Sequence, residues 1–118
     1  MTMDIAQIKT EEDVSRFLAG WSDFERDVYL ATFMIPEGMV STYGRIAEKI
    51  GRPKAYRAVA NALHKNPLHL VVPCHRVVTA DGRFGGNKKR ADDRRKLVES
   101  EDVPTENGKV KMSKDIIF

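Results

Sequence analysis

Apolar residues recur at helical spacing through the first third of the chain. Thr10, followed by three acidic residues, predicts the start of a helix that ends at Gly20. Ser22 with Glu25 three residues later matches a capping box and predicts the start of a second helix. Its apolar stripe runs as far as Pro36 and Gly38 and consists of Phe24, Val28, Ala31, Thr32 and Ile35. We expect this second helix to be the main helix of the core.

Two shorter helices are predicted next, on either side of a tight turn at Gly51. Ser41 and Thr42 provide caps for the first, and its apolar stripe consists of Tyr43, Ile46, Ala47 and Ile50. Pro53 occupies a favourable first-turn position of the second, which ends before Asn66 and directs inward Val59, Ala62 and Leu63. This arrangement is typical of a helix-turn-helix with residues 54–64 as the recognition helix, although helical hairpins that bind no DNA share it.

Residues 54–64 are rich in alanine, with Ala55, Ala58, Ala60 and Ala62. Few long polar side chains are present to read base edges in a major groove. The segment therefore favours sequence-independent contact, including close approach in a minor groove. The alternative is that the alanines pack against the core, and for Ala58 and Ala62 we prefer this alternative.

The second half of the chain predicts short extended segments. We expect residues 70–72 and 77–78 to form two short buried extended pieces around Pro73-Cys74-His75-Arg76, and Asn107-Gly108 predicts a hairpin turn within residues 104–118. We therefore expect residues 1–118 to form one domain of mostly helical α/β class, a winged helix-turn-helix.

Composition narrows the class of protein. The 118 residues are 42% hydrophobic and 31% charged, which fits one modest core and excludes a disordered tail or a membrane protein. No apolar run approaches the roughly 20 residues that cross a bilayer, and the opening residues lack a leader pattern. We expect an intracellular protein, either cytoplasmic and nucleoid-associated or, in a eukaryote, nuclear.

The net charge of +3 hides a strongly basic segment. Residues 41–98 carry fourteen basic and four acidic side chains, whereas the segments before and after are acidic. Such a segment attracts polyanions, of which nucleic acid is the commonest inside cells. An ordinary solvated surface is the alternative.

Cys74 is the single cysteine, so it forms neither an internal disulfide nor the usual multi-cysteine zinc site. A thiolate is a nucleophile that a neighbouring imidazole and an orienting carboxylate can activate, and His75 with a later acid would supply both. A structural cysteine is the alternative, because adjacent side chains of an extended segment point to opposite faces. His64, His69 and His75 lack partner ligands at recognisable spacing, so no metal is predicted.

The motif VVPCHRVV strongly resembles the active-site motif of the O6-alkylguanine-DNA alkyltransferases, also called methylated-DNA-protein-cysteine methyltransferases. FERDVYLATFMIPEGMVSTYGRIAEKIGRP and RAVANALHKNPLHLVVPCHRVV are similar to further segments of that family. The resemblance covers about residues 23–103. It implies a stand-alone C-terminal catalytic domain of the family, without the separate N-terminal domain.

The resemblance implies irreversible, single-turnover transfer of an alkyl group, such as methyl, from O6 of guanine to Cys74, with no cofactor. His75 would deprotonate Cys74 through a water, and Glu101 would hold His75. Tyr43 would donate its hydroxyl proton to a guanine ring nitrogen, and Asn66 would brace the turn beside the cysteine. Simpler alternatives are a helix-stripe residue for Tyr43, a solvated acid for Glu101 and a cap for Asn66.

The implied partner is double-stranded DNA that carries O6-alkylguanine, bound by a monomer with no membrane contact. Arg57 would enter the base stack as the damaged nucleotide rotates into the pocket, unless it contacts only phosphate. The other predicted DNA contacts are Tyr43, Thr42, Lys54, Ala55, Tyr56, Ala58, Asn61 and Arg76.

The chain departs from the family pattern in the loop that closes over the alkyl pocket. After Gly85 and Gly86 it continues with Asn87, Lys88, Lys89 and Arg90 instead of an aromatic residue, a small polar residue and further glycines. Tyr56 stands where a small residue is frequent, and Asp102 replaces a common glycine. The sequence therefore leaves the alkyl preference open.

Two other functions remain as alternatives. The first is a non-catalytic alkyltransferase-like sensor that binds alkylated DNA and recruits excision-repair proteins. Such sensors lack the acceptor cysteine, so the presence of Cys74 argues against this alternative. The second is a plain DNA-binding module with a vestigial cysteine.

Overall fold

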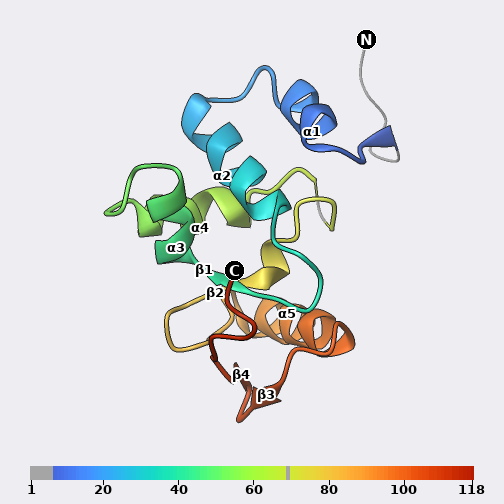
Figure 1. Cartoon of the computed structure of the whole chain (residues 1–118), viewed down its shortest axis with the longest axis vertical. Coiled ribbons are helices and arrows are strands. Elements are labelled where there is room, and N and C mark those ends of the chain that lie inside the picture. Colours follow the sequence, from blue (N-terminus) through green and yellow to red (C-terminus); the bar gives the residue numbers. More distant parts are fainter. Residues whose placement is uncertain (1–6, 69) are drawn as a thin grey trace.

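Helices form most of the framework in the computed structural model of the chain, which describes residues 7–68 and 70–118 (Figure 1). The α-helices are α1 (Glu11–Phe17), α2 (Asp23–Phe33), α3 (Tyr43–Lys49), α4 (Tyr56–His64) and α5 (Lys88–Ser100). His69, considered above as a metal ligand, and residues 1–6, considered for a leader, lie outside the described residues. In the described part of the chain, no helix combines the length and apolar character needed to cross a bilayer.

Two small sheets complete the mostly helical α/β fold. Strand β1 (Ser41–Thr42) pairs in parallel with β2 (Val77–Val78), with Ser41 opposite Val77. Strands β3 (Thr105–Glu106) and β4 (Lys109–Val110) form the predicted hairpin. Asn107 and Gly108 have φ values of 54° and 77°, and two positive φ values are what a type I′ hairpin turn requires.

The predicted helix starts are confirmed for α1, α2 and α3 by side-chain caps. Thr10 Oγ1 accepts a hydrogen bond from the Asp13 N–H at 3.1 Å, and Ser22 Oγ accepts one from the Glu25 N–H at 3.2 Å. Thr42 Oγ1 accepts the Arg45 N–H at 3.1 Å. Because Thr42 is the last residue of β1, this cap begins α3 directly at the end of the strand.

Three predicted boundaries are wrong. Helix α4 begins at Tyr56 because Pro53 occupies a turn closed by a hydrogen bond from the Ala55 N–H to the Arg52 carbonyl, and this turn suits the fixed φ of proline equally well. Helix α1 ends at Phe17, before Gly20. Residues 70–71 form a turn, with φ of 71° at Leu70, instead of an extended piece.

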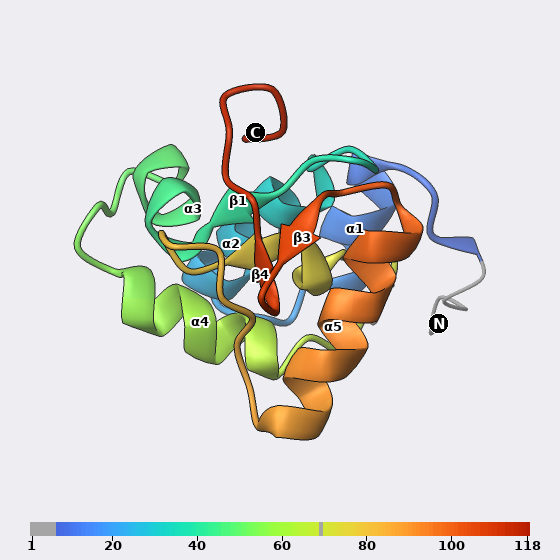
Figure 2. The ribbon, with the colours of Figure 1, turned by 90° about the horizontal axis from the view of Figure 1, so that it is seen from below.

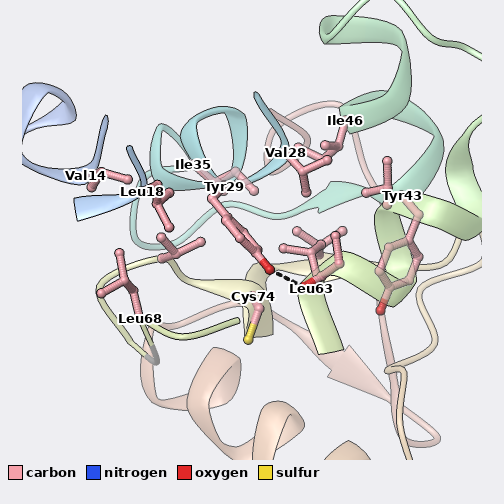
Figure 3. Close-up of a cluster of buried hydrophobic side chains, with 14 of the residues drawn as sticks. Val14, Leu18, Val28, Tyr29, Ile35, Tyr43, Ile46, Leu63, Leu68 and Cys74 are labelled. Carbon is pink, nitrogen blue, oxygen red and sulfur yellow. Dashed lines mark hydrogen bonds between the residues drawn. The ribbon is translucent and has the colours of Figure 1, made fainter. Parts of the chain in front are cut away.

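Helices α3 and α4 form the predicted helix-turn-helix, and Gly51 ends α3 with φ of 78°. The loop between β2 and α5 runs beside α4 (Figure 2). The side chain of Tyr29 connects α2 to α4, because its hydroxyl donates a 2.7 Å hydrogen bond to the carbonyl of Ala62 in α4, inside the main core (Figure 3).

A second, smaller core attaches α5 to the sheets. Its buried members are all valines: Val40, Val78, Val98, Val103 and Val110. These residues come from the segment before β1, from β2, from α5 and its C-terminal end, and from β4. Packing among them places the last turn of α5 next to the segment that follows Cys74.

Asp102 closes α5 in a left-handed conformation, with φ of 66°. Its N–H bonds to the Glu99 carbonyl and the Val103 N–H bonds to the Val98 carbonyl, which is the Schellman pattern with Asp102 at the position that favours glycine. We expect Asp102→Gly to raise the free energy of unfolding by about 0.5–1 kcal/mol, because glycine adopts this φ without steric cost.

Thermal and denaturant unfolding of the two proteins measure this difference. The matched control is Ser100→Gly, in the last turn of α5, where the backbone is helical and glycine is expected to destabilise by a similar amount. A melting temperature of Asp102→Gly at or below that of the parent would contradict the expectation.

Candidate active site and DNA interface

Cys74 begins a single 3₁₀ turn, Cys74–Arg76, that leads into β2. The residue is 6% exposed, and its sulfur lies at the rim of the main core, pointing away from Tyr29 toward α5 (Figure 3). The sequence predicted an extended segment here, in which Cys74 and His75 would point to opposite faces. In a 3₁₀ turn successive side chains are only about 120° apart, so this objection to a cooperating pair does not hold.

A cavity of about 330 Å³ opens beside the sulfur. The C-terminal end of α4 lines one side of it, the 3₁₀ turn a second and α5 a third. The residues that line it include Leu63, His64, Cys74, His75, Arg90, Arg94 and Leu97. The cavity therefore joins the candidate nucleophile to the end of the predicted recognition helix.

Glu101, immediately after α5, holds His75. His75 Nε2 lies 3.1 Å from Glu101 Oε2, and both side chains are buried or nearly so. Hydrogen bonds from Arg76 and His75 lower the pKa of Glu101 below its usual value, so the carboxylate is ionised and only accepts hydrogen bonds. Nε2 must then carry the proton, which makes Nδ1 the basic ring atom of His75.

Arg76 was predicted to contact DNA, but its guanidinium is engaged inside the protein. Nε and NH2 donate to Glu101 Oε1 and Oε2 at 2.8 and 2.7 Å, a bidentate pair, and NH1 donates to the Ile35 carbonyl at 2.8 Å. This geometry holds both carboxylate oxygens of Glu101, one of which also meets His75, so Arg76 positions Glu101; its contact with DNA stays a prediction.

Asn66 spans the turn that precedes Cys74. Its side-chain amide donates to the Val72 carbonyl at 2.8 Å, and its Oδ1 accepts the Leu68 N–H at 2.8 Å. The two bonds hold together the ends of residues 66–72, so Asn66 braces this turn and is not a simple helix cap.

Tyr43, Arg94 and His64 converge at Gly85. A methyl group added at Gly85 would lie 2.5 Å from Tyr43 Oη, 3.2 Å from His64 Nε2 and 3.3 Å from Arg94 NH1. Burial raises the pKa of Tyr43, and the charge of Arg94 partly offsets this effect, so the phenol stays protonated at neutral pH. Within the described part of the chain, Tyr43 Oη makes no hydrogen bond of ordinary geometry and remains available as a donor.

Sequence reasoning did not identify Arg94 or His64 as site residues. Arg94 projects from α5 one turn after Arg90 and one turn before Leu97, and all three line the cavity. Their spacing of four and three residues places them on one face of a helix and is the available sequence signal, but the many other charged residues of α5 conceal it. Among the described residues, no group of three or more side chains is arranged to hold a metal ion.

The outward face of α4 carries most of the predicted DNA contacts. Lys54, Tyr56, Arg57, Ala58 and Asn61 are exposed, and Ala55 is half-buried. Ala62 packs in the core as expected, but Ala58 does not, which corrects our preference for that alanine. Thr42 is buried and engaged as the cap of α3.

Arg57 and Tyr56 lie at the start of this face. The Arg57 guanidinium carbon is 5.9 Å from the centre of the Tyr56 ring, which is itself 48% exposed. Figure 2 shows α4 with the N-terminal end of α5 beside it, so the basic start of α5 extends the same face. Arg57 is thus placed on a cationic surface of α4, whose other end lines the cavity.

The arrangement can perform nucleophilic chemistry on a group presented from a polyanion. The thiol is beside a histidine whose tautomer a buried carboxylate sets, and the cavity opens next to a basic helix. A buried phenol is available to donate a proton.

The chain matches the family described as "6-O-methylguanine DNA methyltransferase, DNA binding domain" over residues 23–103. A methylated-DNA–protein-cysteine methyltransferase of Mycobacterium bovis is 47% identical over 87 residues, which are 70% of this chain and 52% of the relative. The chain spans about half the length of the curated relatives that it matches.

Two solved structures are also similar. OGT of Mycobacterium tuberculosis in complex with DNA has a TM-score of 0.64 and 42% identity, covering 68% of this chain and 50% of that one. S. pombe Atl1, in complex with damaged DNA containing O6-carboxymethylguanine, has a TM-score of 0.69 and 31% identity, covering 81% of this chain and 94% of that one.

Proposed function

The chain belongs to the 6-O-methylguanine DNA methyltransferase family, and from this premise we propose that it repairs DNA by moving an alkyl group from O6 of guanine to its own Cys74. The observation that carries the proposal is the position of the Cys74 sulfur at a cavity backed by the His75–Glu101–Arg76 array. Each molecule would act once, because the S-alkyl thioether that forms is stable.

The transfer is a direct displacement. His75 accepts the thiol proton, through a water, and the Cys74 thiolate attacks the alkyl carbon. The new sulfur–carbon bond forms as the carbon–O6 bond breaks, and the electron pair of that bond stays on guanine. Glu101 stabilises the imidazolium that forms, and Arg76 keeps Glu101 in place.

Guanine leaves as a neutral base if it receives a proton. Tyr43 is placed to supply it, because burial keeps the pKa of the phenol raised and its hydroxyl protonated at neutral pH, while the charge and contact of Arg94 partly offset this rise and so make the proton easier to give up. Arg94 stands beside Tyr43 and favours the phenolate that remains. The Tyr43 proton is regained when the product is released to solvent.

The substrate is double-stranded DNA that carries the adduct, bound through α4 by a monomer. A damaged base reaches the cavity only when it leaves the base stack, and a weakened base pair lowers the cost of this rotation. The exposed Tyr56 and Arg57 stand at the first turn of α4, whose last turn lines the cavity, and a side chain of this helix can fill the space left by the base.

Mass spectrometry of the Cys74 peptide tests the proposed function. After incubation with duplex DNA containing O6-methylguanine, we expect the peptide to gain the mass of one methyl group, in stoichiometric amount. Unmodified DNA and the Cys74→Ala protein serve as controls. An unchanged mass with tight binding of the damaged duplex would refute the transferase and favour the damage sensor.

Arg57→Ala is expected to weaken binding of damaged duplex and slow transfer from it by about tenfold, because it removes a phosphate or stacking contact worth about 1–2 kcal/mol. Reaction with free O6-benzylguanine, which needs no base rotation, is expected to stay within about twofold. Arg16→Ala, on α1 and paired with Glu12, is the matched arginine control. Equal losses on duplex and free base would exclude Arg57 from base rotation.

A further inference from the structure

Arg94 is a buried cation whose charge is only partly compensated. The residue is 9% exposed, and its NH2 group lies 4.0 Å from Cys74 Sγ, a weak contact. Within the described residues NH1 makes no hydrogen bond of ordinary geometry, the Tyr43 hydroxyl is its neighbour, and no carboxylate forms an ion pair with the guanidinium. The side chain lines the cavity beside the nucleophile.

Such a group destabilises the free protein. Removing a guanidinium from water costs several kcal/mol unless a charged partner and full hydrogen bonding replace the water. The neighbouring Arg95 illustrates the usual solution, since it lies in reach of Asp92 and Glu99 at 3.7 and 3.6 Å on the outer side of α5. Arg94 has no carboxylate partner among the described residues; the groups beside it are the Tyr43 hydroxyl and the Cys74 sulfur, which leaves the guanidinium able to meet an anion that arrives in the cavity with the substrate.

We propose that Arg94 forms a subsite for alkyl groups that end in an anionic group, so that the cavity accepts O6-carboxymethylguanine-type adducts in preference to neutral adducts of the same size. The inference rests on the proposed transfer to Cys74 and names the substrate class of the same site. The ligand of Arg94 is the carboxylate of the adduct.

The position of Arg94 relative to the sulfur fits this class of adduct. In a carboxymethyl adduct the carboxylate is bonded to the same carbon that Cys74 attacks. When the sulfur is in line with that carbon, the carboxylate oxygens lie within a few ångströms of the sulfur, where Arg94 NH2 already is. NH2 and NH1 together offer the fork that binds a carboxylate with two parallel bonds.

The positive charge of the cavity lining also favours an adduct that carries an anionic group. Arg90 and Arg94 both line the cavity and place two positive charges at this end of α4; burial, and after it these two charges, lower the pKa of His64. Asp93 also lines the cavity, but it is exposed to solvent, which screens its charge. A carboxylate would otherwise repel the attacking thiolate, and Arg94 offsets this repulsion.

The chemical step is unchanged by the anionic group. The sulfur–carbon bond forms, the carbon–O6 bond breaks, and the product is S-carboxymethylcysteine at position 74. The carboxylate keeps its charge throughout, so no proton or co-reactant is added. Arg94 contacts the adduct before and after transfer.

The test compares two adducts that differ only in charge, O6-carboxymethylguanine and its neutral carbamoylmethyl isostere, each placed in the same duplex. We expect the wild-type protein to react faster with the carboxymethyl adduct. Arg94→Met is expected to lower the ratio of the two rates by about tenfold or more, as for loss of a charged hydrogen bond. Arg94→Lys should keep part of the preference, and Arg95→Met, the matched control on the outer side of α5, should keep all of it.

A ratio that Arg94→Met leaves unchanged, while transfer from both adducts persists, would overturn the inference and leave the proposed function intact. If the wild-type protein transfers neither adduct, the proposed function fails. The inference is then tested by binding: the affinity for the carboxymethyl duplex divided by that for the carbamoylmethyl duplex should fall in Arg94→Met. Thermal unfolding checks the fold of the variant: we expect Arg94→Met to melt at or above the wild-type temperature, because it removes an unpaired buried charge. A melting temperature clearly below wild type would indicate a structural role and contradict the inference.

Discussion

Glu101→Gln is expected to slow alkyl transfer about a hundredfold or more. The amide is uncharged, so it stabilises the imidazolium of His75 less well, and it can donate to Nε2 and so favour the wrong tautomer. It also leaves the Arg76 guanidinium, whose side chain is mostly buried, without its bidentate partner. Breaking a buried ion pair from one side destabilises by about 3–5 kcal/mol.

Stability as a function of pH separates this positioning role from a general loss of fold. The pKa of Glu101 is lower in the folded protein than its usual value of 4.5, so its contribution to stability is present above that value. This contribution is lost as the pH falls through the folded-state pKa. We therefore expect wild type to lose stability on acidification below about pH 4.5, and Glu101→Gln to lose less over the same window.

Glu106→Gln is the matched control. Glu106 lies on the C-terminal hairpin and has an exposed 3.8 Å contact with Lys111, so its replacement is expected to change stability by less than about 1 kcal/mol. Its transfer rate should equal that of wild type. An equal effect of the two substitutions on transfer would refute a specific role for Glu101 in positioning His75.

Gly85→Ala is expected to reduce transfer by about a hundredfold while the protein remains folded. The added methyl group would lie 2.5 Å from Tyr43 Oη, so the buried phenol has to move by more than a few tenths of an ångström. Misplacement of a reacting group by about 1 Å costs around a hundredfold in rate. Overpacking of this kind destabilises by about 1–3 kcal/mol.

Transfer rates and unfolding curves of two glycine variants measure this effect. Gly20→Ala is the matched control, because no atom outside its immediate surroundings lies within 4 Å of the added methyl group. We expect its transfer rate to be unchanged. Normal transfer by Gly85→Ala would show that the Tyr43 hydroxyl does not need its present position.

The sequence by itself determined most of the local elements and singled out the candidate nucleophile. Caps at Thr10, Ser22 and Thr42, the stop at Gly51 and the turn at Asn107-Gly108 are properties of a few adjacent residues, and all are found in the structure. The helix-turn-helix follows from the apolar stripes of two such elements. Cys74 could be singled out because it is the only cysteine and lies in a specific motif.

For residues that fit two different surroundings equally well, only the tertiary structure decided the role. Arg76 follows His75 directly, and no local signal distinguishes an arginine that contacts DNA from one that pairs with Glu101, 25 residues later. Pro53 fits the first turn of a helix and the second position of a β-turn equally well, and a backbone hydrogen bond decided between them.

The site itself was decided by packing between distant segments. Arg94 is one of many charged residues in α5, and it faces the cavity because the valine core fixes the rotation of that helix against β2 and the C-terminal hairpin. Charge and spacing along the chain specify what a side chain can do. Which groups it meets depends on the contacts of the folded chain, and those contacts brought the guanidinium of Arg94 next to the sulfur of Cys74.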